Sequence, residues 1–234
     1  STGSDVFYFY LSGGQVYVQN YIGANQIELK SDAILKDFTA WYHLIVAIDT
    51  TQSTEANRVK AWVNGVELTW VSSPRTYPAQ DFQTKWNTGS QEHQIGHSST
   101  TYSSDYFARA ASYDGQTMTD PATDGFGKFD DTGVWVPLDV SGKTFGTTGF
   151  LIEGGAAFTN GTDSSGNSQN FTKGGTITDV DDTLTDKASD NFGNYATINL
   201  GNMDGGAVPV ISNGLTTFTR NGTGSDNQQA YATQ

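Results

Sequence analysis

The stretch that decides the fold reads Arg58-Val59-Lys60-Ala61-Trp62-Val63-Asn64-Gly65-Val66-Glu67-Leu68-Thr69-Trp70. Its Asn64-Gly65 pair predicts a two-residue type I′ hairpin turn, because glycine adopts positive φ freely and asparagine tolerates it. Side chains alternate between the faces of a sheet, so the turn also sets the facing pairs: Val63 with Val66, Ala61 with Leu68, and Val59 with Trp70. The opposite face carries Lys60, Trp62, Glu67 and Thr69. A slip of one residue would expose the whole apolar set, so turn and pattern predict the same register.

The run before this hairpin predicts a second strand. It reads Ala40-Trp41-Tyr42-His43-Leu44-Ile45-Val46-Ala47-Ile48-Asp49 and is apolar on both faces. Such a pattern is typical of a strand inside a sheet that is covered on both sides. A buried helical segment is the alternative, which the aromatic and β-branched content disfavours.

Composition indicates an all-β protein. The 234 residues include 27 glycines, 12% aromatic residues and only 16% charged residues. This combination is typical of many short strands joined by tight turns. Disorder is excluded as a general description, because disordered chains contain few aromatic and β-branched residues.

The charge and cysteine content narrow the function classes. A net charge of −13 disfavours nucleic acid and anionic membranes as partners. No apolar run reaches the ~18 residues of a membrane span, so we expect no membrane insertion. The chain has no cysteine, which excludes disulfides and thiolate sites and fits assembly in a reducing cytoplasm.

Further elements follow from local turn chemistry. A hairpin is predicted from Val6–Leu11 and Gln15–Tyr21 across Ser12-Gly13-Gly14. One helical turn is expected within Met118–Phe129, with Asp120 as N-cap and Pro121 after it. The remaining predicted strands are Tyr106–Tyr113, Val134–Val136, Phe150–Glu153, Tyr195–Leu200, Ala207–Ile211 and Leu215–Arg220, the last two flanking Asn213-Gly214. Residues 159–193 are predicted to be mostly loop.

Several motifs in chain order resemble one family. They are Trp41-Tyr42-His43, the Val63-to-Thr69 hairpin, Tyr106-to-Gln116 with its Asp-Gly-Gln ending, Thr132-to-Pro137, Phe145-to-Phe150, Asp163-to-Asn167 and Asn191-to-Leu200. Together they resemble the laminin-G-like, concanavalin A-like jelly-roll domains of virion structural proteins in tailed, often marine, phages. One departure is Asp105, where the family commonly has glycine before the strand.

The resemblance implies an antiparallel β-sandwich of jelly-roll type with a loop-rich C-terminal extension. We expect residues 1–118 to form the sandwich, lacking its first strands, and residues 119–234 to form the extension, packed on the sandwich or on neighbouring subunits. The opening Ser1-Thr2-Gly3-Ser4-Asp5 has no initiator Met, so we expect a portion of a longer virion polypeptide.

The function implied is that of a non-enzymatic virion protein, a tail fibre or a capsid or tail appendage. Its partners would be other virion proteins, further copies of itself (a trimer is one option) and a host-surface glycan. It would be assembled in the host cytoplasm. The alternative is a free-standing carbohydrate-binding module or a glycan-degrading enzyme of the concanavalin A-like superfamily.

The sequence offers little sign of catalysis or zinc binding. Glycoside hydrolases need two carboxylates flanking one bond, whereas the five glutamates, at positions 28, 55, 67, 92 and 153, are isolated. His93 and His97 have the spacing of a helical zinc pair, but on a strand they would lie ~13 Å apart.

Two kinds of binding site are predicted. An exposed aromatic platform with acidic neighbours suits a glycan or a partner, and its candidates are Trp62, Glu67, Tyr42 and Trp86. No cofactor is expected except calcium, whose ligands would be carboxylates and amides. The calcium candidates are Asp163, Asn167, Asp179, Asp181 and Asp182.

Overall fold

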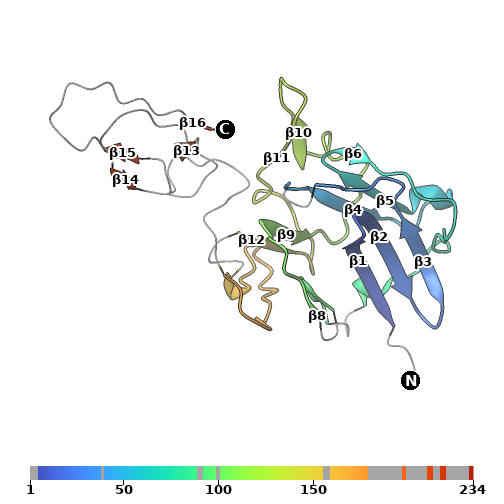
Figure 1. The fold of residues 1–234 in the computed structure, drawn as a ribbon. Coiled ribbons are helices and arrows are strands. Elements are labelled where there is room, and N and C mark those ends of the chain that lie inside the picture. Colours follow the sequence, from blue (N-terminus) through green and yellow to red (C-terminus); the bar gives the residue numbers. More distant parts are fainter. Residues whose placement is uncertain are drawn as a thin grey trace.

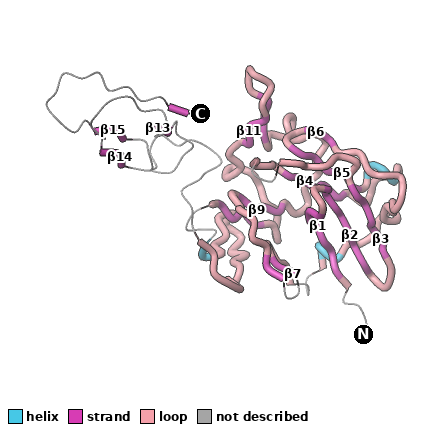
Figure 2. The backbone as a smooth tube through the Cα atoms, in the orientation of Figure 1, coloured by secondary structure: helices cyan, strands magenta, loops and turns pink. Residues whose placement is uncertain are grey.

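A computed structural model describes residues 5–37, 40–88, 92–98, 101–154 and 159–178, with four short strands beyond them. These residues form an all-β chain (Figures 1 and 2). Helix in this part of the chain is confined to the 3₁₀ turns η1 (Glu55–Asn57) and η2 (Lys85–Asn87) and a helical turn at 159–160. The strands are β1 (Val6–Ser12), β2 (Gln15–Tyr21), β3 (Asn25–Lys30), β4 (Leu44–Ile48), β5 (Val59–Val63), β6 (Val66–Glu67), β7 (His97–Ser98), β8 (Thr101–Tyr102), β9 (Arg109–Ser112), β10 (Gly127–Phe129), β11 (Trp135–Pro137), β12 (Phe150–Glu153), β13 (Thr197–Ile198), β14 (Val210–Ser212), β15 (Thr217–Thr219) and β16 (Ala232–Thr233).

The first sheet has the strand order β1-β2-β3 and is antiparallel throughout. The predicted hairpin is confirmed: Ser12 pairs with Gln15 across Gly13 and Gly14, which have φ values of +57° and +76°. Burial alternates along β2, where every second side chain turns towards the core. The period-2 pattern of the sequence therefore decides which face is covered.

The second sheet has the order β4-β5-β6. Its Asn64-Gly65 turn has φ values of +48° and +77°, and Trp62 pairs with Glu67 as predicted. The Oδ1 atom of Asn64 accepts a hydrogen bond from the His43 N–H at 2.8 Å. This contact joins the turn to the residue before β4.

The predicted pairing of Val63 with Val66 is confirmed at the turn, although Val66 is not buried, and the prediction is wrong at the far end of the hairpin. Val66 is 61% exposed, because it lies at the turn, beyond the buried part of the hairpin. Trp70 does not pair with Val59; it forms an antiparallel bridge with Ser31 instead. The chain thus leaves β5 after Leu68 and crosses to the first sheet, where the Val71 N–H donates to the Lys30 carbonyl.

The two sheets share their core. Val16 of β2 packs in one cluster with Ala61, Val63 and Leu68. A second cluster joins Val59 to the first-sheet residues Val18, Ile27 and Leu29. Half-buried side chains of β4 complete both clusters, so one face of each sheet is buried against the other.

A separate cluster organises the later segment. Strand β9 pairs with β12, and β10 pairs with β11. Val140, Phe145 and Leu151 are buried together, with Tyr113 and Phe126 packed against them. The β9–β12 pairing joins residues on both sides of the boundary expected at residue 118.

Several other expectations are met only in part. Strands β9 and β11 overlap the predicted ones but differ in length or position, and 159–178 contains no strand, as expected of a loop. Between Met118 and Phe129 a single turn forms, with the Asp124 N–H bonded to the Asp120 carbonyl, but no helix follows because Gly125 adopts φ +73°. Strand β13 pairs with β16, and β14 pairs with β15, whereas Asn213-Gly214 lies outside the described residues.

Within the described residues, no helix has the length and apolar character needed to cross a bilayer.

Candidate functional site

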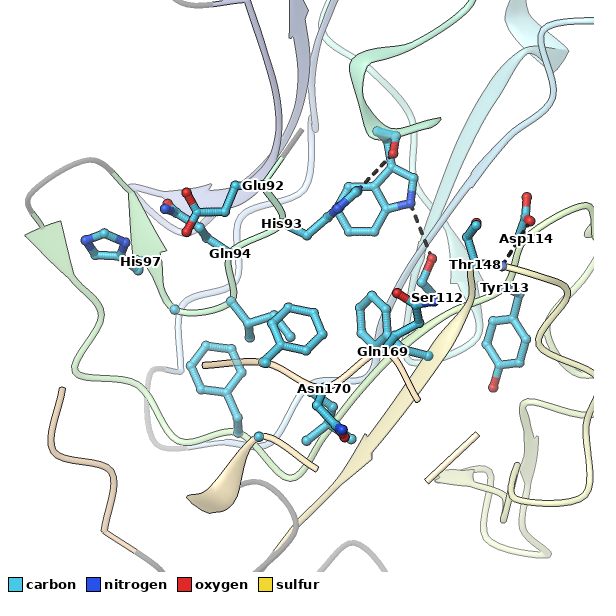
Figure 3. Close-up of a pocket in the computed structure, with 18 of the residues that line it drawn as sticks. Glu92, His93, Gln94, His97, Ser112, Tyr113, Asp114, Thr148, Gln169 and Asn170 are labelled. Carbon is cyan, nitrogen blue, oxygen red and sulfur yellow. Dashed lines mark hydrogen bonds between the residues drawn. The ribbon is translucent and has the colours of Figure 1, made fainter. Parts of the chain in front are cut away.

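A large open groove is the main concave feature of the described residues (Figure 3). Its volume is about 1900 Å³, well above the ~300–1,000 Å³ of a small-molecule pocket. Its lining comes from Trp41 and from segments within 48–51, 81–88, 92–97, 102–107, 112–117, 148–161 and 169–178. A hollow of this size suits an extended ligand better than a compact one.

Exposed aromatic side chains gather along this groove. The described residues expose twelve large hydrophobic side chains, and five of them line it. All five are aromatic: Trp41 (40% exposed), Trp86 (36%), Tyr102 (58%), Tyr106 (70%) and Phe107 (39%). Exposed apolar patches of this kind mark interaction sites.

Trp86 is fixed within the groove by contacts on several sides. Its Nε1 atom donates to the Ser112 hydroxyl at 3.3 Å, and its ring meets the ring of Phe7 edge-on. His93 lies edge-on to the same indole, 4.5 Å between ring centres, and its Nε2 atom lies 2.9 Å from the Trp86 carbonyl (Figure 3). A carbonyl can only accept, so Nε2 of His93 carries the proton.

Tyr102 holds another part of the groove lining. Its ring stacks on His97 with 4.4 Å between ring centres. Its hydroxyl donates to the Gly174 carbonyl at 2.9 Å, across 72 residues of sequence. Tyr106 stands nearby, in an edge contact with Trp41. The groove walls are thus joined by side chains from distant segments.

The polar lining is mainly acidic or neutral. The carboxylates are Asp49, Asp81, Glu92, Asp105 and Asp114, whereas Lys173 is the one lysine or arginine among the described lining residues. Hydrogen bonds from Thr51 and Gln52 lower the pKa of Asp49 and keep it ionised. Gln94, Gln169 and Asn170 add amide groups (Figure 3). This charge balance favours neutral ligands over anionic ones.

The predicted contact residues do not form one platform. Trp86 lies in the groove, but Trp62 is only 2% exposed and Tyr42 packs against the first core cluster. Glu67 forms a surface ion pair with Lys60 at 3.2 Å. Trp62 is therefore covered within this chain, which is one of the three covers expected for a large aromatic side chain on that face, the others being a neighbouring subunit and a glycan.

A second layer from the later chain accounts for the burial of Trp62. On the same face of the sheet, His43 accepts a hydrogen bond from Trp135, and Ala47 and Lys60 line a small hollow with residues 116–118. The second layer, one of the covers expected for this face, is thus formed by segments distant in sequence.

The candidate calcium residues that the structure describes have another role. Both carboxylate oxygens of Asp163 accept hydrogen bonds, Oδ1 from the N–H groups of Leu151 and Ser165, and Oδ2 from the Gln169 N–H and the Ser165 hydroxyl, all at 2.8 Å. Burial opposes ionisation of Asp163, but these hydrogen bonds prevail and lower its pKa. The Nδ2 atom of Asn167 donates to the carbonyls of Gly146 and Gly149.

These bonds leave the Asp163 oxygens little capacity to hold a cation. Within the described residues, no group of three His, Cys, Asp or Glu side chains could hold a metal ion. Asp179, Asp181 and Asp182 lie outside the described residues.

Sequence reasoning missed most of the aromatic lining. Tyr106 and Phe107 were assigned to a strand, but that strand begins only at Arg109. The one sign of the groove in the sequence was that these two aromatic residues stand next to each other shortly after the polar run Ser98–Ser104.

The groove has to be interpreted from its own residues, because comparison with protein-family models, with curated proteins and with solved structures found no match for this chain.

Proposed function

We propose that this chain is a non-enzymatic structural protein of a phage virion, a tail fibre or a capsid or tail appendage, whose groove contacts a glycan on the host surface. The observation that carries the glycan part is the set of five exposed aromatic side chains along one groove. The virion part depends on the motif resemblance, from Trp41-Tyr42-His43 to the Asp163-to-Asn167 loop.

The fold we propose is an antiparallel β-sandwich of jelly-roll, concanavalin A-like type. Its support is that two three-stranded sheets share two hydrophobic clusters and are bridged between Ser31 and Trp70. Many proteins of this architecture carry binding sites on loops at the sheet ends. The segments around η2 and β7 line the groove here.

Glycan recognition fits the chemistry of the lining. The apolar faces of sugar rings stack on aromatic side chains, and amides and carboxylates accept hydrogen bonds from hydroxyl groups. Covering 100 Å² of apolar surface contributes roughly 2.5 kcal/mol of binding free energy. Several aromatic side chains that contact successive sugars of one glycan would therefore bind it with useful affinity. The carboxylates repel sulfated or uronic-acid glycans, so we propose a neutral glycan.

In the virion, the chain would assemble in the host cytoplasm with other virion proteins and with copies of itself. The same groove would serve a free-standing carbohydrate-binding module or a glycan-degrading enzyme. The location of the protein distinguishes a virion component from a free-standing module, and the release of sugar products distinguishes an enzyme from both.

Two measurements test the proposal. Mass spectrometry of purified virions should find the chain among the particle proteins, and a glycan array should show binding to neutral rather than acidic glycans without release of reducing ends. Detection only in soluble fractions outside particles would favour the free-standing alternative. Release of reducing ends would overturn the non-enzymatic assignment.

A further inference from the structure

Strand β1 is an unprotected sheet edge. It pairs with β2 over all seven of its residues and with no other described strand. Edge strands usually carry charged residues, proline or a bulge that prevents further pairing. The β1 sequence Val6-Phe7-Tyr8-Phe9-Tyr10-Leu11-Ser12 has no charge and no proline, and its pairing has no register shift.

The turn geometry decides which backbone groups point outward. A two-residue hairpin closes on a hydrogen-bonded pair, here Ser12 with Gln15, and such pairs alternate along an antiparallel ladder. Val6, Tyr8, Tyr10 and Ser12 therefore bond to β2. Phe7, Phe9 and Leu11 direct their N–H and C=O groups away from it. No backbone hydrogen bond from these three residues to another described segment is present.

Side-chain burial identifies the same edge. Phe9 and Leu11 share a face with Val18 and Val16, which are 0% and 1% exposed. Phe9 is nevertheless 36% exposed and Leu11 48% exposed, and Tyr10 on the other face is 38% exposed. Phe7 on the core-facing side of β1 packs on Trp86, whereas Phe9 and Leu11 stay exposed at the edge.

We infer that β1 pairs antiparallel with β1 of a second copy of this chain, about a two-fold axis at Phe9. In this register Phe9 faces Phe9 of the partner subunit, and Phe7 faces Leu11 of the partner subunit. Every hydrogen-bonding residue of one edge then meets a hydrogen-bonding residue of the other. The two first sheets become one six-stranded sheet.

The tyrosines of the opposite face fit the same register. Tyr8 and Tyr10 meet edge-on at 6.2 Å, and Tyr10 stacks on Tyr17 at 4.9 Å between ring centres. Pairing about Phe9 places Tyr8 beside Tyr10 of the partner subunit, which extends this row of rings across the interface. Aromatic pairs across strands stabilise a sheet.

Net charge opposes the pairing of two copies in general, but the β1 edge itself adds nothing to this repulsion. The chain carries a net charge of −13, so two copies repel each other over most of their surfaces. Strand β1 contributes no acidic or basic side chain to that repulsion. The groove lining includes no residue of β1, so pairing and glycan contact use different residues.

The mass of the particle in solution tests the inference. Light scattering after size-exclusion chromatography should give twice 25.1 kDa for the wild-type chain. Phe9→Lys should give 25.1 kDa, because it places a charge at the centre of the interface. Val66→Lys, at an exposed position in another sheet, is the matched control and should stay dimeric.

Two further measurements guard against misfolding and test the register. Phe9→Pro removes the Phe9 side chain and an N–H that points away from β2, so it leaves the β1–β2 hydrogen bonds in place and should also yield monomer. Because the chain lacks cysteine, spin labels on single cysteines at positions 6 and 12 report distances between copies without altering Phe9. The two distances should be equal, because both positions lie three residues from the axis and each label is offset from its copy by ~20 Å along the strands.

Any of four results would overturn the inference. They are a monomeric wild type, a trimeric mass, a dimer that survives both Phe9 variants, or unequal distances between copies at positions 6 and 12.

Discussion

Trp135 donates a hydrogen bond from Nε1 to Nδ1 of His43 at 3.0 Å, joining residues 92 positions apart in sequence. The indole also lies against two glycines: a Cβ added at Gly65 or Gly127 would lie 2.3 or 2.1 Å from its ring atoms. One side chain therefore fixes the Asn64-Gly65 turn, the start of β4 and the β10–β11 pair together.

The His43 contact predicts a pH dependence of stability. Burial, aided by the nearby Arg109 charge, lowers the pKa of His43 from 6.5 to about 4. Between these values the unfolded chain binds a proton that the folded chain does not, so stability falls as pH drops from 6.5 to 4. The shift corresponds to up to about 3 kcal/mol. Urea unfolding at a series of pH values measures it.

His43→Gln is the variant that isolates this effect, because its amide oxygen can accept the Trp135 bond and does not titrate. It should be less pH-dependent than the wild type across this window. Below this range the carboxylates of Asp49 and Asp163, whose pKa values are lowered, become protonated and stability falls further. An unchanged slope in His43→Gln would show that another group is responsible.

Gly127→Ala should be destabilising by steric overlap. The new Cβ would meet the Trp135 ring, and overpacking of this kind costs about 1–3 kcal/mol. Gly142→Ala is the control, since nothing lies within 4 Å of its Cβ position. Denaturant midpoints compare the two. Equal stabilities would mean that Trp135 does not pack on Gly127.

Asp163→Asn should loosen the loop that follows β12. The amide nitrogen cannot accept the hydrogen bonds that reach one of the two carboxylate oxygens, which should cost about 1–3 kcal/mol. Asp131→Asn, at an exposed position, should have little effect. Thermal unfolding measures both variants.

The same experiment with calcium separates the two roles considered for Asp163. Because its oxygens already accept four hydrogen bonds, neither calcium nor EDTA should shift the wild-type Tm. A calcium-dependent rise in Tm that Asp163→Asn abolishes would restore the cation site.

Local turn chemistry made part of this fold predictable. Gly13-Gly14 and Asn64-Gly65 both adopt positive φ, and alternation then decides which side chains of β2 are buried. In β5 alternation fails at Trp62, which is buried on the opposite face. The path of Trp70 was not predictable, because its bridge to Ser31 depends on how two sheets meet rather than on neighbouring residues.

The candidate site was less predictable for the same reason. The sequence indicated that Trp62 lies opposite Glu67 on a face that something must cover, but not which segments cover it. Trp86 was expected near Trp62, whereas it lines the groove with Tyr102 and Tyr106. A groove lined by many separate segments leaves no single motif in the sequence.

The most direct test of glycan contact is an affinity titration with the neutral glycan that binds best on the array. Tyr106→Ala removes the most exposed aromatic side chain of the groove and should weaken binding roughly tenfold, equivalent to about 1.4 kcal/mol. Phe129→Ala, which removes an exposed aromatic side chain outside the groove, should bind as wild type. Equal affinity of Tyr106→Ala and wild type, or a loss confined to Phe129→Ala, would contradict glycan binding in this groove.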